Sequence, residues 1–118
     1  MRTIERSFAI LIVLLLFISC SSKDDEPCIN PSGLTVSTAY PTRVELRWYV
    51  GNDAPSYTVE YGRAGFSLGS GNQFTVAGGF KNLTGLQPDT EYQAYIRSNC
   101  SDSKVSEFSR PFNFWTKP

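Results

Sequence analysis

The sequence contains no histidine, a single methionine and three cysteines, and its 11 basic residues are balanced by 11 acidic ones. Without histidine, the chain cannot form a Ser-His-Asp or a Cys-His catalytic site. Without an excess of positive charge, it has no electrostatic basis for binding nucleic acid. We therefore expect a protein that is not an enzyme, needs no cofactor and binds no nucleic acid.

An apolar segment from Phe8 to Ile18 follows a basic start at Arg2 and Arg6. The segment has the length of a signal-peptide core and falls well short of the roughly 20 residues that span a bilayer. We expect residues 1–19 to be a signal peptide that is removed.

The segment ends in LFISC, where Cys20 directly follows the small residue Ser19. This ending resembles the lipobox of bacterial lipoproteins. The resemblance implies that Cys20 becomes the first mature residue and carries lipid on its sulfur, so that the membrane is one partner. The alternative is an ordinary secretory signal with an incidental cysteine.

Residues 20–27 form a polar stretch that reads CSSKDDEP. It has too little apolar mass to pack, so we expect a solvated tether. The SSKDDE run resembles the export signal of Bacteroidota-type lipoproteins, which implies the cell-surface side of the outer membrane. If the run is only a tether, the protein faces the periplasm instead.

Removal of residues 1–19 takes away two arginines and one glutamate, which leaves a net charge of about −1. The remaining length of roughly 100 residues fits one domain with a modest core. We expect a single domain over residues 28–118, in a monomeric protein.

With Cys20 assigned to lipid, Cys28 and Cys100 remain as a pair in an oxidising compartment. We expect these two residues to form a disulfide that closes a loop of about 70 residues. A metal site is the competing interpretation, but two thiolates without histidine do not make a zinc site. We therefore expect no metal.

Short alternating segments recur along the chain, separated by Gly, Pro, Asn and Asp, and no segment shows a sustained helical period. The pattern is typical of an all-β protein. The seven expected strands are residues 34–38, 43–50, 56–61, 73–76, 80–84, 91–98 and 107–116. Pro111 cannot donate to a sheet ladder, which favours an edge position for the last strand.

Alternation within three of these segments separates an inward from an outward face. The residues expected to point inward are Val44, Leu46, Trp48, Val50, Tyr57, Val59, Tyr61, Tyr92, Ala94 and Ile96. The residues expected to point outward from the second strand are Arg43, Glu45, Arg47 and Tyr49.

Some of these residues resemble the fibronectin type III module: Trp48 in the second strand, Tyr57 opening the third, and LQPDTEY from Leu86 to Tyr92. SEFSRPFNFWT is similar to the last strand of that module. The resemblance implies an immunoglobulin-like Greek-key β-sandwich. It also implies that Leu86 closes the bottom of the sandwich and that Tyr92 makes a corner hydrogen bond.

In such a sandwich, consecutive strands alternate in direction, so the first strand begins at the pole where the sixth ends. This places Cys28 and Cys100 at the same pole. Because only eight residues separate Cys20 from Cys28, the tether spans at most about 28 Å. We expect the disulfide pole to face the membrane and the C terminus to point away.

The outward face of the third, sixth and seventh strands is the candidate ligand surface. The residues expected there are Glu60, Gln93, Tyr95, Arg97, Asn113 and Trp115. Tyr95, Arg97 and Trp115 are the candidate binding residues, because Tyr, Arg and Trp dominate contact energies in recognition. The alternative is that these aromatic side chains only cover the sheet.

Two short motifs resemble catalytic or phosphate-binding signatures but lack their context. SDSK, from Ser101 to Lys104, has Ser-x-x-Lys spacing in a loop between strands, where the required helix is absent. GSGNQF lacks the remaining residues of a phosphate loop, so hairpin turns explain its glycines.

Together these features predict a lipid-anchored cell-envelope protein whose domain is a binding or adhesion module for an unknown protein or glycan. Two alternatives remain. The domain could be an accessory subunit that docks onto an outer-membrane or periplasmic complex, or a non-catalytic appendage of a hydrolase system.

Overall fold

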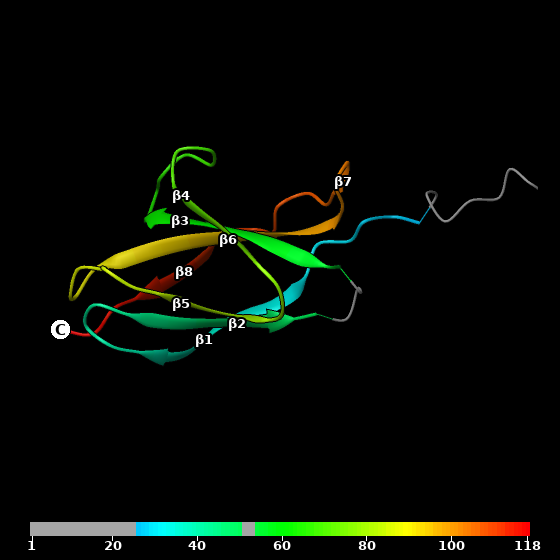
Figure 1. The fold of residues 1–118 in the computed structure, drawn as a ribbon. Coiled ribbons are helices and arrows are strands. Elements are labelled where there is room, and N and C mark those ends of the chain that lie inside the picture. The colour runs from blue at the N-terminus through cyan, green and yellow to red at the C-terminus, as the bar shows by residue number, and fades with distance from the viewer. Residues whose placement is uncertain (1–25, 51–53) are drawn as a thin grey trace, which may run out of the picture.

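The computed structural model describes residues 26–50 and 54–118 (Figure 1). The expected signal peptide, Cys20 and most of the tether lie outside these residues. The described chain consists of strands, turns and loops. The strands are β1 (Ser32–Ala39), β2 (Val44–Tyr49), β3 (Ser56–Arg63), β4 (Asn72–Val76), β5 (Phe80–Leu83), β6 (Glu91–Ser101), β7 (Lys104–Val105) and β8 (Phe112–Trp115).

The strands form two antiparallel sheets that face each other as two layers (Figure 1). One sheet has three strands in the order β1-β2-β5. The other has five, in the order β4-β3-β6-β7, with β8 also paired to β6. The expected all-β sandwich is confirmed, and the third, sixth and last strands do share one sheet.

The core lies between the two sheets and includes the residues expected to point inward, with the exception of Val50. Its buried members are Val44, Leu46, Trp48, Tyr57, Val59, Tyr61, Leu83, Leu86, Tyr92, Ala94, Ile96 and Phe114. Trp48 and Tyr57 meet edge to face across the two sheets, with ring centroids 5.9 Å apart. Such pairs contribute about 0.5–1.5 kcal/mol beyond their buried area.

Val50 is an exception to the expected inward set, because its side chain is 45% exposed. β2 ends at Tyr49, and its ladder with β5 extends no further than the bond from the Trp48 amide to the Gly79 carbonyl, 3.0 Å. Beyond that point the chain leaves the sheet, so alternation no longer determines which way a side chain points.

The expected last strand, 107–116, is also incorrect in its extent. Two separate strands, β7 and β8, pair with β6 at the edge of the sheet, and Pro111 lies in the irregular segment between them. Serine hydroxyls replace backbone carbonyls in this gap. Ser106 Oγ accepts from the Ser98 amide at 2.8 Å, and Ser109 Oγ accepts from the Ile96 amide at 3.1 Å. Because these hydroxyls accept hydrogen bonds from two amides of β6, the edge segment can bulge away from β6.

Cys28 and Cys100 form the expected disulfide, with an S–S distance of 2.05 Å. Nearby, Ser98 Oγ donates to the Ile29 carbonyl at 2.7 Å, and Lys104 Nζ donates to the Glu26 carbonyl. The start of the domain is therefore attached to the end of β6. The C terminus lies at the opposite end of the sandwich, as expected (Figure 1).

The Tyr92 hydroxyl accepts a hydrogen bond from the Gln87 amide at 2.8 Å, which confirms the expected corner. Tyr92 is buried and stacks on Phe114, so the bond is shielded from water. It fixes the connection from β5 to β6 against the core.

We expect Tyr92→Phe to lower the free energy of unfolding by about 1 kcal/mol, because the Gln87 amide loses its partner. Urea unfolding measures this change. Tyr49→Phe is the matched control, since Tyr49 is 73% exposed and the same substitution there should change stability by less than about 0.5 kcal/mol. Equal stability of the two variants would contradict a structural role for the corner.

Candidate functional site

The predicted ligand surface, the outward face of β3, β6 and β8, is more covered than alternation alone suggests. Glu60 and Gln93 are buried, Tyr95 and Arg97 are half-buried, and Asn113 and Trp115 are exposed. The direction of these side chains agrees with expectation, but the exposure of Glu60 and Gln93 does not.

Glu60 is buried because the connection between β3 and β4 folds over it. Glu60 Oε2 accepts from the amides of Gly69 at 2.5 Å and Gly71 at 3.0 Å. Its Oε1 accepts from Gln73 Nε2 at 2.7 Å. A Cβ at position 71 would lie 2.6 Å from a backbone oxygen of β3, so only glycine lets the connection approach this closely. The carboxylate therefore anchors the loop over the sheet.

Burial of the Glu60 carboxyl, the largest single influence, would by itself raise its pKa. The hydrogen bonds from Gln73, Gly71 and Gly69, together with the positive charge of Arg97, act in the opposite direction. Their sum exceeds the effect of burial, so the pKa of Glu60 lies below its ordinary value. Glu60 is therefore charged at neutral pH, and each carboxylate oxygen has at least one donor.

The same loop covers Tyr95. The Gly65 amide donates to Gln93 Oε1 at 2.7 Å, and Gln93 Nε2 donates to the Tyr95 hydroxyl at 3.1 Å. The Tyr95 ring packs edge to face against Phe66 on one side and Phe108 on the other, at centroid distances of 5.6 and 6.4 Å. The hydroxyl and ring of Tyr95 are thus largely engaged in contacts with other residues of the domain.

Arg97 lies beside this aromatic cluster, and its guanidinium carbon is 4.8 Å from the centroid of the Phe108 ring. Its Nε is buried and has no hydrogen-bond partner among the described residues. Arg97 also acts on Glu60 through its charge. Its position is consistent with a role in holding the covered face together.

Trp115 stands apart from the other two candidates. It is 58% exposed and pairs across the ladder with Glu91, four residues from Tyr95 along β6. Four residues of strand span about 13 Å. The structure brings Tyr95 and Arg97 together and leaves Trp115 as a separate exposed ring, so the three do not form one contact patch.

The Ser-x-x-Lys motif forms the hairpin between β6 and β7, in which Ser101 pairs with Lys104. This agrees with the interpretation of SDSK as a turn. Across residues 26–50 and 54–118, three or more potential metal ligands nowhere come together, and a helix able to cross a membrane is absent from those same ranges.

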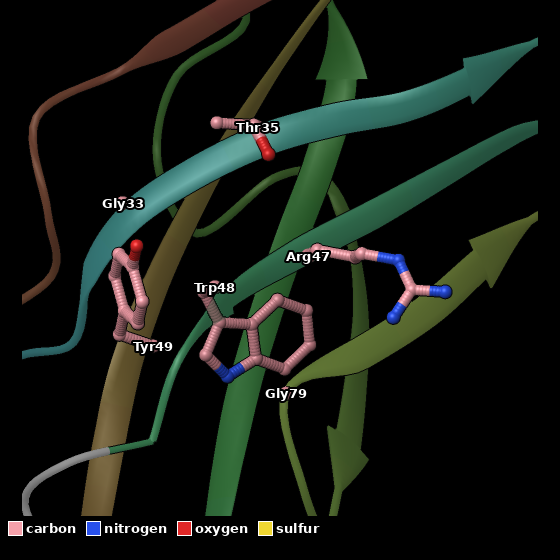
Figure 2. A pocket seen from close by; sticks show the side chains of 6 residues that line it. All are labelled: Gly33, Thr35, Arg47, Trp48, Tyr49 and Gly79. Atoms are coloured by element: carbon pink, nitrogen blue, oxygen red, sulfur yellow. The ribbon is translucent and has the colours of Figure 1, made fainter.

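The opposite sheet carries an open hollow that the sequence did not indicate (Figure 2). It has a volume of about 370 Å³ and a mostly apolar lining, formed by Gly33, Thr35, Arg47, Trp48, Tyr49 and Gly79. The hollow lies over β1 and β2 and reaches the start of β5.

Two glycines of the lining allow close approaches around this hollow. Gly33 has a φ of 71°, and a Cβ there would lie 2.5 Å from the Tyr49 ring. A Cβ on Gly79 would lie 2.5 Å from the Trp48 carbonyl oxygen. Alternation places Tyr49 and Arg47 outward, but it does not show these close approaches, which involve glycines 46 residues apart in sequence. Gly33 and Gly79 come together only because β2 lies between β1 and β5 in the sheet.

The Tyr49 ring and the Arg47 guanidinium extend toward opposite ends of the hollow (Figure 2). Arg47 Nε donates to Ser37 Oγ at 3.3 Å, and the guanidinium carbon lies 4.8 Å from the Phe80 ring centroid. Among the described residues, the two terminal amino groups of Arg47 have no hydrogen bond or ion pair. These groups remain available to an anion.

No family model matches the chain, and no curated protein matches it. Among solved structures, the fold is similar to the FN1–FN3 domains of chicken CNTN1, with a TM-score of 0.69 and 17% identity over 78% of this chain. This chain spans only 31% of that one.

Two single domains are similar over most of both chains. The fn3 domain of the human collagen alpha-1(XX) chain has a TM-score of 0.67 and 25% identity, covering 83% of this chain and 93% of that one. The fn3 domain of human contactin 1 has a TM-score of 0.67 and 22% identity, covering 82% and 84%. With the two-sheet topology and the Tyr92 corner, these similarities establish that the described domain has the fibronectin type III fold.

Proposed function

We propose that this protein is a bacterial lipoprotein, anchored through lipid on Cys20, whose domain is a non-catalytic binding module displayed on the cell surface. One observation carries the proposal. The described chain begins at the disulfide pole and ends at the opposite pole (Figure 1). An anchor eight residues before Cys28 would therefore hold one pole near the membrane and leave both sheet faces accessible.

The sequence supplies the anchor. LFISC places Cys20 where a lipoprotein signal ends, and SSKDDE follows as the export-type tether. Two or more acyl chains give stable attachment, whereas a single chain is marginal. The fold supports a binding role because such a sandwich presents surfaces on a rigid scaffold, although fold alone does not identify the ligand.

Replacing the anchor tests the attachment. We expect Cys20→Ala to move the protein from the membrane fraction to the soluble fraction, because no acyl chain can be attached. Fractionation followed by immunoblotting measures this. Ser22→Ala is the control, since it changes a residue of the tether but leaves both the anchor and the disulfide intact. Continued sedimentation of the Cys20→Ala variant with membranes would contradict the lipoprotein assignment.

Protease treatment of intact cells tests the display, with a tag placed at the C terminus. We expect the tag to be lost from intact cells as readily as from lysed cells. Protection until lysis would place the domain in the periplasm, contradict the surface role, and favour docking onto an envelope complex.

A further inference from the structure

We infer that the hollow on the three-stranded sheet is a binding site for an acidic oligosaccharide, that is, an unbranched chain of sugar rings bearing carboxylates. This inference rests on the proposed binding role and names its site and ligand class. The site consists of the hollow together with the Tyr49 ring at one end and the Arg47 guanidinium at the other.

The anionic part of the ligand follows from Arg47. A guanidinium presents a fork of N–H donors that matches a carboxylate. Ser37 and the Phe80 ring hold the Arg47 side chain in place, so little side-chain freedom remains to be lost on binding. The nearest carboxylate on the same strand, Glu45, lies on the far side of Arg47 from Tyr49 and accepts from Ser37 Oγ at 3.2 Å. It leaves the hollow itself without an acidic side chain.

The sugar part follows from Tyr49 and the lining. Tyr49 is 73% exposed, and its ring lies against Gly33. An exposed aromatic face is suited to the C–H face of a sugar ring, whose hydroxyls then point to the rim. The lining is mostly apolar, while the Thr35 hydroxyl offers one polar contact. A volume of about 370 Å³ is within the range of small-molecule sites.

The positions of the two end groups favour an oligomer over a single sugar. Because the Tyr49 ring and the Arg47 guanidinium extend toward opposite ends of the hollow, an oligomer can place one ring on Tyr49 and the carboxylate of another at Arg47 (Figure 2). An acidic peptide fits less well. Extended peptides bind by adding a strand to a free sheet edge. Here β2 is already paired on both sides, to β1 and β5, so a peptide backbone would find no partners in the hollow.

Isothermal titration calorimetry tests the inference, using the mature lipidated protein in neutral detergent micelles. The probes are tri-galacturonate, monomeric galacturonate and the neutral trisaccharide maltotriose. We expect tri-galacturonate to bind at least about tenfold more tightly than either of the others. Its affinity should fall as salt is added, because an ion pair contributes.

Variants on the two sheets localise the site. Arg47→Gln and Tyr49→Ala should each weaken tri-galacturonate binding at least about tenfold, whereas Tyr49→Phe, which keeps the ring, should change it less than about threefold. Arg97→Gln and Trp115→Ala are matched controls on the other sheet and should leave the affinity unchanged. Thermal unfolding of each variant checks that the fold is retained.

Several results would overturn the inference: no binding of tri-galacturonate, binding that Arg47→Gln leaves intact, or loss of binding only in the Arg97→Gln or Trp115→Ala variant. Binding of a glutamate-rich peptide through Arg47, without saccharide binding, would also overturn the ligand class. A surface-displayed protein that binds no saccharide contradicts this inference alone. A saccharide-binding protein that never reaches the membrane contradicts only the proposed anchoring.

Discussion

Replacing Cys28 and Cys100 together by serine should lower the free energy of unfolding by about 4 kcal/mol. The bond joins residues 72 apart, so its removal lets the unfolded chain explore many more conformations. In the folded state, the contacts of Ile29 and Glu26 with β6 and β7 depend on the same attachment. For a domain of this size the melting temperature should fall by roughly 20 °C.

Urea unfolding of the double variant and of the wild type measures this loss. Wild-type protein treated with a reducing agent is the internal control, because it should unfold with the double variant if the effect comes from the bond. A change below about 1 kcal/mol in both would show that the two cysteines are not joined in the mature protein.

Local sequence patterns predicted the sandwich correctly wherever a strand has neighbours on both sides. In β3 and β6, alternation identified Tyr57, Val59, Ala94 and Ile96 as core residues, and all four are buried. These strands are central in their sheet, so ladder bonds on both edges hold the alternating geometry. The Tyr92 corner and the disulfide were also predicted from the sequence, because each has a distinctive residue type at a characteristic position.

The errors lie where contacts between distant segments decide the outcome. Alternation gave the correct side for Glu60, but it could not show that a loop would fold over that side. The break between β7 and β8 depends on two serine hydroxyls that replace carbonyls, which a strand pattern does not encode. Val50 is exposed because the ladder to β5 ends before it.

The two candidate surfaces illustrate the same limit. Tyr95 and Arg97 were selected for their residue type, but the structure shows that Phe66 and Phe108 already contact them. The local pattern does not indicate the hollow beside Tyr49, because its lining comes from three segments that are separate in sequence, β1, β2 and the residue before β5. Residue type therefore identified candidate side chains, but it did not distinguish those that pack within the domain from those that are exposed to solvent.

A second large effect is expected from Glu60→Ala, which should lower the free energy of unfolding by about 3 kcal/mol. The substitution leaves the amides of Gly69 and Gly71 and the Gln73 side chain without their acceptor under the loop. Urea unfolding at pH 7 measures it. Glu60→Gln is the matched variant, because the new amide oxygen can still accept from the two glycines while Gln73 turns to accept from the new amide nitrogen. It should cost about 1 kcal/mol.

The difference in free energy of unfolding between the wild type and Glu60→Gln should also depend on pH. Because folding lowers the pKa of Glu60 below 4.5, the unfolded chain takes up the proton first as the pH falls. The stability contributed by the charge is complete above that value and is lost as the pH falls through the lower, folded pKa. The other carboxyl groups titrate in both proteins, so the difference between them isolates Glu60. We expect this difference to shrink as the pH falls below 4.5. A difference that stays constant as the pH is lowered would mean that the loop over β3 does not depend on the charge of Glu60.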